Sequence, residues 1–206
     1  MSHGVVPDRL AEGARAGIGP LARAIAGAGI SANTVTIVGG VLSIVGAGFL
    51  AAGVPLPALL VLLIGTVADT LDGQIAKASG GGTRLGAFLD STVDRIADGA
   101  LFVGAAASGA NLGQPLLLWS SLVALVASFL VPYVRAKAES LGVSASVGPA
   151  PREARIVIFL IGLAGWALFD FQAMFVAAVL ALAVLASITF VLRVVHVGRQ
   201  LSIKER

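Results

Sequence analysis

The sequence contains no cysteine, so neither a disulfide framework nor a thiolate metal site is available to it. Charged residues are also scarce, at 12%, whereas 57% of the residues are hydrophobic and the mean hydropathy is +0.97. A chain of 206 residues cannot bury that much apolar surface in one water-soluble core. The scarcity of charge therefore excludes an ordinary soluble domain and indicates a protein of the lipid bilayer.

Six apolar stretches approach the length of helix needed to cross the hydrocarbon core of a membrane, about 20 residues. The second and third reach that length only when each is extended through the polar segment between them. We therefore expect an all-α integral membrane protein with six transmembrane helices. The apolar stretches are Val35–Ala52, Pro57–Val67, Gly99–Ala107, Leu116–Val134, Ile156–Phe169 and Ala173–Leu192.

Lys and Arg are missing from three of the connections between these stretches, 53–56, 108–114 and 170–172. All fourteen basic residues fall on the other side, which includes both termini. By the positive-inside rule this side is cytoplasmic. We expect a multi-pass protein of the cell membrane with cytoplasmic termini, and no nucleic-acid partner despite a pI near 10.0.

One membrane domain is expected over residues 31–195, because no long linker interrupts it. In the preceding segment, 1–30, the residues Pro7–Ala26 place apolar side chains on one helical stripe. This pattern predicts an amphipathic helix on the membrane surface, with a merely solvated helix as the alternative. Residues 196–206 are expected to form a basic cytoplasmic tail.

Five of the eleven acidic residues fall in one segment, 67–99. Asp69 and Asp72 are three residues apart, and Asp90 and Asp94 are four apart, so each pair shares a helix face. Because the two helices are antiparallel neighbours, we expect the four carboxylates to meet in one pocket at the cytoplasmic boundary. A hard divalent cation such as Mg²⁺ relieves the repulsion between such charges.

Two alternatives to a metal site stay open. The aspartates either pair with Lys77, Arg84 and Arg95 or cap helices, or they carry protons or cations through the membrane as in a transporter. The transporter is disfavoured because the acids lie at one end of their helices and not near the midplane. Asp98 continues the row of acids, and we expect it to pair with Arg95.

The segment resembles the signature of the CDP-alcohol phosphatidyltransferase family, D-x2-D-G-x2-A-R-x8-G-x3-D-x3-D. All spacings match, and the one departure is a Lys where the family has Arg, which keeps the charge but loses the bidentate fork. The matching residues are Asp69, Asp72, Gly73, Ala76, Lys77, Gly86, Asp90 and Asp94.

The resemblance implies six transmembrane helices and a Mg²⁺-dependent reaction in which an alcohol displaces CMP from CDP-diacylglycerol. Two Mg²⁺ ions are expected, with Mn²⁺ as an alternative, and a homodimer is implied. Carried over by position, the metal ligands are Asp69, Asp72, Asp90 and Asp94, and Asp94 is also the catalytic proton acceptor.

The resemblance also implies contacts to CDP-diacylglycerol. Gly73 and Gly86 would admit the cytidine, because a side chain there blocks its approach. Lys77 and Thr83 would contact the diphosphate. The segment "SANTVT" loosely resembles the family's T-P-N-x-x-T, so further contacts are expected from Ser31, Asn33 and Thr34. An equal alternative is that Ser31 or Asn33 serves only as a helix cap.

A basic cluster bears on the acceptor alcohol. Each cation alone is explained as an anchor that snorkels to lipid headgroups, but together they are suited to a phosphate on the acceptor. The segments "VRAKAES" and "PREAR" make the chain similar to bacterial phosphatidylinositol phosphate synthases. This resemblance implies myo-inositol phosphate as the acceptor. The alternative is a phosphatidylglycerophosphate synthase, which uses glycerol phosphate. The candidate residues are Arg135, Lys137, Arg152, Arg155 and Arg193.

Overall fold

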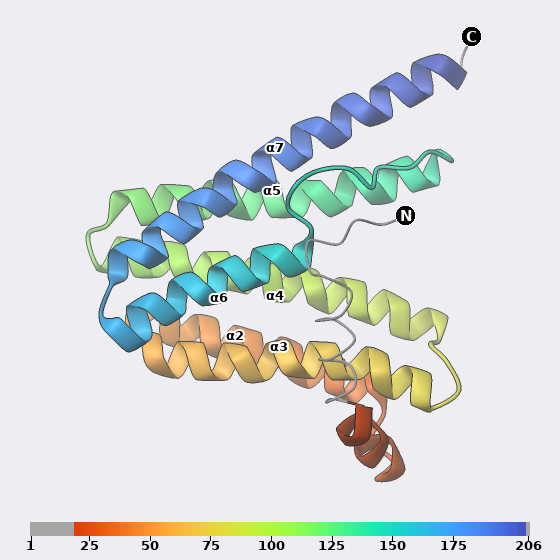
Figure 1. Ribbon diagram of the computed structural model, residues 1–206, viewed down its shortest axis with the longest axis horizontal. Coiled ribbons are helices and arrows are strands. Elements are labelled where there is room, and N and C mark those ends of the chain that lie inside the picture. The colour runs from red at the N-terminus through yellow and green to blue at the C-terminus, as the bar shows by residue number, and fades with distance from the viewer. Residues whose placement is uncertain (1–18, 205–206) are drawn as a thin grey trace. The chain divides into compact units, whose positions relative to one another are not determined.

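The structure is a computed structural model that describes residues 19–204, and over this range it contains helices, turns and loops but no strand (Figure 1). The all-α fold expected from the sequence is confirmed. The part of the predicted amphipathic segment that precedes residue 19 lies outside the described residues, and residues 19–27 are helical. The long helices are α2 (Ala32–Ala51), α3 (Pro55–Ala78), α4 (Arg84–Asn111), α5 (Pro115–Ser140), α6 (Arg152–Phe169) and α7 (Gln172–Lys204).

Four helices in the described part of the chain are long and apolar enough to cross a membrane: Ala32–Ala51, Pro55–Ala78, Pro115–Ser140 and Gln172–Ile203. The remaining two, α4 and α6, are rich in charge in the half that holds the candidate site residues. As expected, α3 continues through its acidic residues, and α4 begins well before its apolar half. The polar segment is therefore helical and lengthens both helices.

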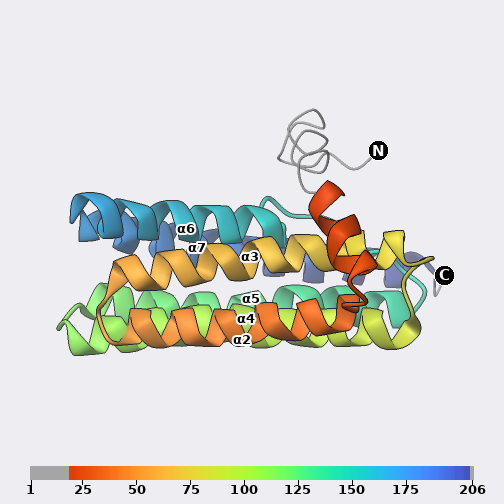
Figure 2. The ribbon, with the colours of Figure 1, turned by 90° about the horizontal axis from the view of Figure 1, so that it is seen from below.

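The chain divides into two compact units. The described part of the first comprises residues 19–45 and 61–97, and the second comprises 46–60 and 98 onward. In the first unit α2 and α3 run antiparallel and side by side (Figures 1 and 2). In the second, α7 packs against both α5 and α6.

Small residues set the spacing of helices in the first unit. A Cβ on Gly39 of α2 would lie 3.4 Å from the carbonyl oxygen of Gly65 on α3, and a Cβ on Gly40 would collide with Val93 of α4. Glycine at these positions lets the helix backbones approach closely. Close packing of α2 against α3 and α4 holds the polar ends of these helices in register.

A cluster of aromatic rings fills the second unit. Phe159 of α6 meets Phe102 of α4 edge to face at 5.9 Å between ring centroids, and Phe175 of α7 at 5.2 Å. Trp166 stacks on Phe175 at 5.7 Å. Such pairs favour one helix arrangement over others, so they fix the direction of α6, whose first turn carries two of the candidate acceptor-binding cations.

Candidate active site

Three of the four signature aspartates converge in the first unit. Asp69 and Asp72 on α3 and Asp90 on α4 each offer a carboxylate oxygen, and these oxygens all lie within 4.8 Å of one another. The chain reverses between the two helices through Gly80 and Gly81, whose φ angles of 96° and 114° favour glycine. This reversal brings the acidic face of α3 opposite the first turns of α4.

The donor set of this cluster fits a hard cation. All the ligand atoms on offer are carboxylate oxygens, which Mg²⁺ and similar ions prefer. Three negative charges at this separation repel one another unless a cation or a proton intervenes. The cluster can therefore hold a metal ion.

Asp72 is the buried member of the cluster, with 6% of its surface exposed. The hydroxyl of Thr36 on α2 donates a hydrogen bond of 2.6 Å to Asp72 Oδ2. Thr36 is itself buried, so the contact orients the carboxylate from outside the ligand set. Thr36 is absent from the residues predicted for the site, although it is the last residue of "SANTVT", the segment that resembles the family's T-P-N-x-x-T.

Replacing Thr36 with Val should lower the affinity for Mn²⁺ about tenfold or more, because Val keeps the shape but leaves the Asp72 carboxylate without this orienting donor. Titration of the detergent-solubilised protein with Mn²⁺, followed by electron paramagnetic resonance, measures the change. Thr70→Val is the matched control, since the Thr70 hydroxyl bonds to a carbonyl of its own helix. Equal affinities in the two variants would contradict the orienting role.

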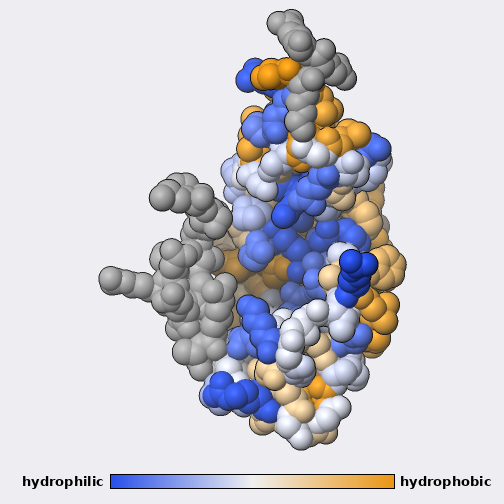
Figure 3. Space-filling view, turned by 90° about the vertical axis from the view of Figure 1, so that its right-hand side faces the viewer, coloured by the Kyte–Doolittle hydropathy of each residue, from blue (hydrophilic) through white to orange (hydrophobic). Residues whose placement is uncertain are grey.

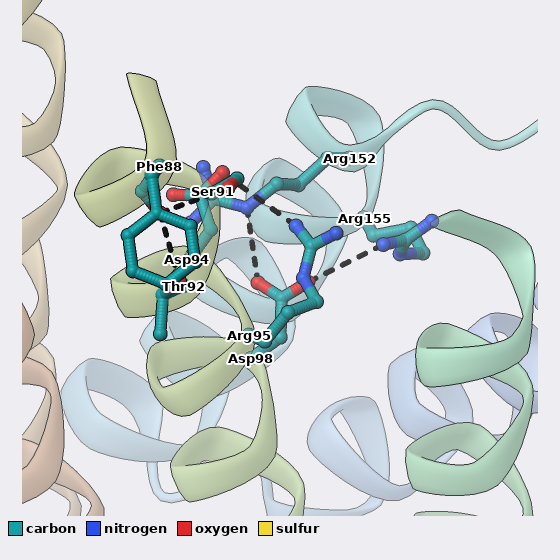
Figure 4. Close-up of polar contacts among 8 residues, drawn as sticks. All are labelled: Phe88, Ser91, Thr92, Asp94, Arg95, Asp98, Arg152 and Arg155. Carbon is teal, nitrogen blue, oxygen red and sulfur yellow. Dashed lines mark hydrogen bonds and ion pairs between the residues drawn. The ribbon is translucent and has the colours of Figure 1, made fainter. Parts of the chain in front are cut away.

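Asp94 stands outside the group of three. It lies one turn beyond Asp90 on α4, its side chain is 16% exposed, and Arg95 Nη2 is 3.5 Å from its Oδ2 (Figure 4). The structure thus assembles three of the four predicted metal ligands. Both roles of Asp94, metal contact and proton acceptor, stay predictions.

A pocket of about 500 Å³ opens beside Asp72 and Asp90 within the first unit. This volume falls in the range of small-molecule sites. Thr34 and Lys77 are not among its lining residues. The lining is Ser31, Ala32, Asn33, Thr36, Asp72, Gly73, Ala76, Ser79, Gly81, Gly82, Thr83, Gly86, Ala87 and Asp90, which includes five of the seven predicted contacts to the nucleotide lipid.

Two of these pocket residues also cap helices. The backbone N–H of Thr34 donates to Ser31 Oγ at 3.1 Å, at the start of α2. The N–H of Gly86 donates to Thr83 Oγ1 at 2.9 Å, at the start of α4. The capping role considered for Ser31 is confirmed, and its contact with a nucleotide stays a prediction.

In the second unit, the two arginines at the start of α6 meet one carboxylate of α4. Arg152 Nε lies 3.1 Å from Asp98 Oδ1, and Arg155 Nη2 lies 3.4 Å from Asp98 Oδ2 (Figure 4). The pairing of Asp98 with Arg95 expected from the sequence stays a prediction, and the contacts of Asp98 with Arg152 and Arg155 were not foreseen. Their signal in the sequence was weak, because α4 and α6 are more than fifty residues apart.

The other predicted cations of the second unit lie on α5 and α7. Arg193 donates from Nε to the carbonyl of Val147 at 3.0 Å and from Nη1 to that of Val131 at 2.9 Å. Arg135 and Arg155 are close enough to Arg193 to interact with its charge. Four of the five cations are therefore linked, because Arg152 and Arg155 share Asp98 while Arg155 and Arg135 act on Arg193. Exposed Arg135 also pairs with Glu139 at 2.9 Å, and Lys137 is exposed at the end of α5.

Figure 3 looks onto the helix ends that the α3–α4 loop joins, and hydrophilic residues gather there. Large apolar side chains are instead exposed along the lengths of the helices, among them Ile37, Leu60 and Val126. This distribution suits helices whose sides face lipid and whose ends face water.

The model of the CDP-alcohol phosphatidyltransferase family matches residues 30–199, and the chain therefore belongs to that family. It is 39% identical over 148 residues to the phosphatidylinositol phosphate synthase of Mycolicibacterium smegmatis, a match that covers 69% of this chain and 65%, less than two thirds, of that protein. It is 35% identical over 185 residues to the archaetidylinositol phosphate synthase of Methanothermobacter thermautotrophicus, covering 89% of this chain and 90% of that one.

Solved structures agree with this assignment. The crystal structure of Mycobacterium tuberculosis phosphatidylinositol phosphate synthase in complex with manganese and citrate matches with a TM-score of 0.81 and 34% identity, over 88% of each chain. The same enzyme with CDP-DAG bound matches with a TM-score of 0.78 and 33% identity, over 87% of this chain and 92% of that chain.

Proposed function

We propose that the protein is a metal-dependent enzyme of the cell membrane that transfers the phosphatidyl group of CDP-diacylglycerol to myo-inositol phosphate and releases CMP. The observation that carries the proposal is the carboxylate cluster of Asp69, Asp72 and Asp90 beside a pocket of about 500 Å³, in a chain of this family. The two relatives compared in sequence are both named for an inositol phosphate product, which supports this acceptor.

In this proposal the pocket of the first unit binds the nucleotide end of the lipid. The pocket is bordered by α2 and α3, both candidate membrane spans, so the acyl chains can remain in the bilayer. Two Mg²⁺ ions held by the signature aspartates would neutralise the diphosphate and the leaving CMP. Mn²⁺ is an alternative, since a related enzyme was crystallised with manganese.

Asp94 acts as the base. Its carboxylate accepts the proton of an inositol hydroxyl, and the hydroxyl oxygen forms a bond to the phosphorus that carries diacylglycerol. The bond from that phosphorus to the bridging oxygen breaks, and CMP leaves with the electron pair. The partly exposed Asp94 carboxylate, one turn along α4 from the cluster, suits a group that must meet a second substrate.

The cations of the second unit bind the phosphate of the acceptor. Arginine forks match phosphate oxygens in a bidentate manner, and the charges of Arg135 and Arg155 both act on Arg193, which favours an anion beside it. Arg152 and Lys137 complete the proposed set. Glycerol phosphate carries the same recognition group, so a phosphatidylglycerophosphate synthase is the competing outcome.

We further propose six spans, with α4 and α6 completing the four candidates. At 1.5 Å per residue α4 is about 42 Å long and α6 about 27 Å, and both lengths suit a bilayer. Segment 1–30 would lie at the cytoplasmic interface, and residues 31–195 would form the membrane domain. Residues 196–206 would form a basic cytoplasmic tail, which is helical as far as Lys204 because α7 extends into it. We also propose that the protein forms a homodimer.

The acceptor is tested by supplying purified protein with CDP-diacylglycerol, Mg²⁺ and one of three alcohols: inositol phosphate, glycerol phosphate or free inositol. Release of CMP should be fastest with inositol phosphate. Faster release with glycerol phosphate would favour the competing synthase. Ion flux in proteoliposomes without CMP release under any condition would instead revive a transporter.

Filling the pocket at Gly73 should raise the KM for CDP-diacylglycerol, about tenfold for Gly73→Leu and less for Gly73→Ala. A Cβ on Gly73 would meet no atom of another element within 4 Å, so Gly73→Ala disturbs no packing, and Ala in a helix is favoured over Gly by about 1 kcal/mol. Gly198→Ala and Gly198→Leu on α7 are matched controls, since a Cβ there also meets nothing. An unchanged KM in Gly73→Leu would show that the nucleotide lies elsewhere.

A further inference from the structure

A buried carboxylate lies beyond the family signature, on the same helix. The signature ends at Asp94, and Asp98 follows one turn later on α4. Only 4% of its surface is exposed. A carboxylate in such a place is costly unless cations and hydrogen-bond donors compensate it, and its partners therefore indicate why it is there.

Both oxygens of Asp98 are engaged by arginines of α6. Oδ1 meets Arg152 Nε at 3.1 Å, and Oδ2 meets Arg155 Nη2 at 3.4 Å. The Arg152 side chain is 20% exposed and that of Arg155 is 5% exposed. Because the contact to Arg152 runs through Nε, it fixes the plane of the guanidinium as well as its position.

Further contacts hold the chain that leads into α6. Arg155 Nη1 also donates to the carbonyl of Ala150 at 3.2 Å, and the N–H of Ala150 donates to the Thr189 hydroxyl on α7 at 3.3 Å. Just before this, Gly148 has a φ of 117°, and a Cβ there would collide with Thr189. The chain entering α6 is therefore tied to α7, and Asp98 ties the arginines of its first turn to α4.

We infer that Asp98 is a positioning residue for the acceptor: it holds Arg152 and Arg155 in the orientation that binds the acceptor phosphate. The inference rests on the proposed function. Arginine side chains lose much rotamer freedom when they bind a phosphate, and a carboxylate that orders them beforehand removes that cost from the binding step. Asp98 itself touches neither substrate in this account.

Asp98→Asn tests the role with little change in shape. Asn keeps one acceptor oxygen but places an amide donor against a guanidinium donor. We expect the KM for inositol phosphate to rise about tenfold or more, whereas kcat at saturating acceptor and the KM for CDP-diacylglycerol change less than about threefold. Asp98→Glu keeps the charge and should give an intermediate acceptor KM. Asp170→Asn is the control, because Asp170 is exposed and its left-handed backbone tolerates Asn.

The outcomes separate this inference from the proposed function. A wild-type protein that releases no CMP with inositol phosphate would overturn the function itself. If the wild type is active, three results for Asp98→Asn would overturn the positioning role. The KM for the acceptor could stay unchanged, or it could fall because the local charge has become more positive. It could also rise by no more than the KM for CDP-diacylglycerol does. If Asp98→Asn fails to fold, the same comparison of the two KM values in Asp98→Glu decides.

Discussion

Asp94→Asn should reduce kcat by about 10²- to 10⁴-fold, the range that a positioned general base contributes. Asn is nearly isosteric and cannot accept the proton of the attacking hydroxyl. The carboxylate cluster of Asp69, Asp72 and Asp90 does not include this residue, so the variant should still bind a divalent cation. Steady-state release of CMP measures the loss.

Three readouts make the Asp94 result specific. The variant should elute as a single species in size-exclusion chromatography, should bind Mn²⁺ within about threefold of the wild type, and should keep its KM for CDP-diacylglycerol. Full activity would remove Asp94 from the role of base. Loss of Mn²⁺ binding together with activity would show that its main contribution is to the metal.

Asp72→Asn should abolish the stabilisation that Mg²⁺ gives the protein, and turnover with it. An ion that binds only the folded protein stabilises it by about 2.7 kcal/mol at a concentration of 100 Kd. Asp72 is the most buried of three acids whose oxygens lie within 4.8 Å, and its loss removes a ligand and its charge. Thermal unfolding in detergent, with Mg²⁺ or with EDTA, measures the shift in Tm.

In EDTA the substitution Asp72→Asn should not lower the Tm. Without an ion, three neighbouring carboxylates repel one another, so removing one charge should leave the Tm equal to that of the wild type or higher. Asp170→Asn is the matched control and should keep the full Mg²⁺ shift. An undiminished Mg²⁺ shift in Asp72→Asn would contradict the metal site.

The carboxylate cluster was predictable from the sequence because helical periodicity is local. Spacings of three and four residues place acids on one face, and a short glycine-containing turn forces the two helices to run antiparallel. The structure confirms that Asp69, Asp72 and Asp90 meet. Periodicity could not decide whether Asp94 joins them, since one further turn moves a side chain about 5 Å along the axis.

Contacts between distant helices were harder to predict. The bond from Thr36 to Asp72 depends on how closely α2 packs on α3, which Gly39 and Gly65 allow but which no local pattern states. The pairing of Asp98 with Arg152 likewise depends on the tertiary placement of α6. The apolar stretches located all six long helices. Where polar residues continue a helix, the helix extends beyond its apolar stretch by a few residues or more.

The central claim is tested most directly by the lipid product. Protein reconstituted in liposomes with CDP-diacylglycerol, inositol phosphate and Mg²⁺ should yield phosphatidylinositol phosphate and CMP in equal amounts, identified by mass spectrometry, and neither product when EDTA replaces Mg²⁺. Absence of that lipid from the active, folded protein, or its undiminished formation in EDTA, would contradict the account.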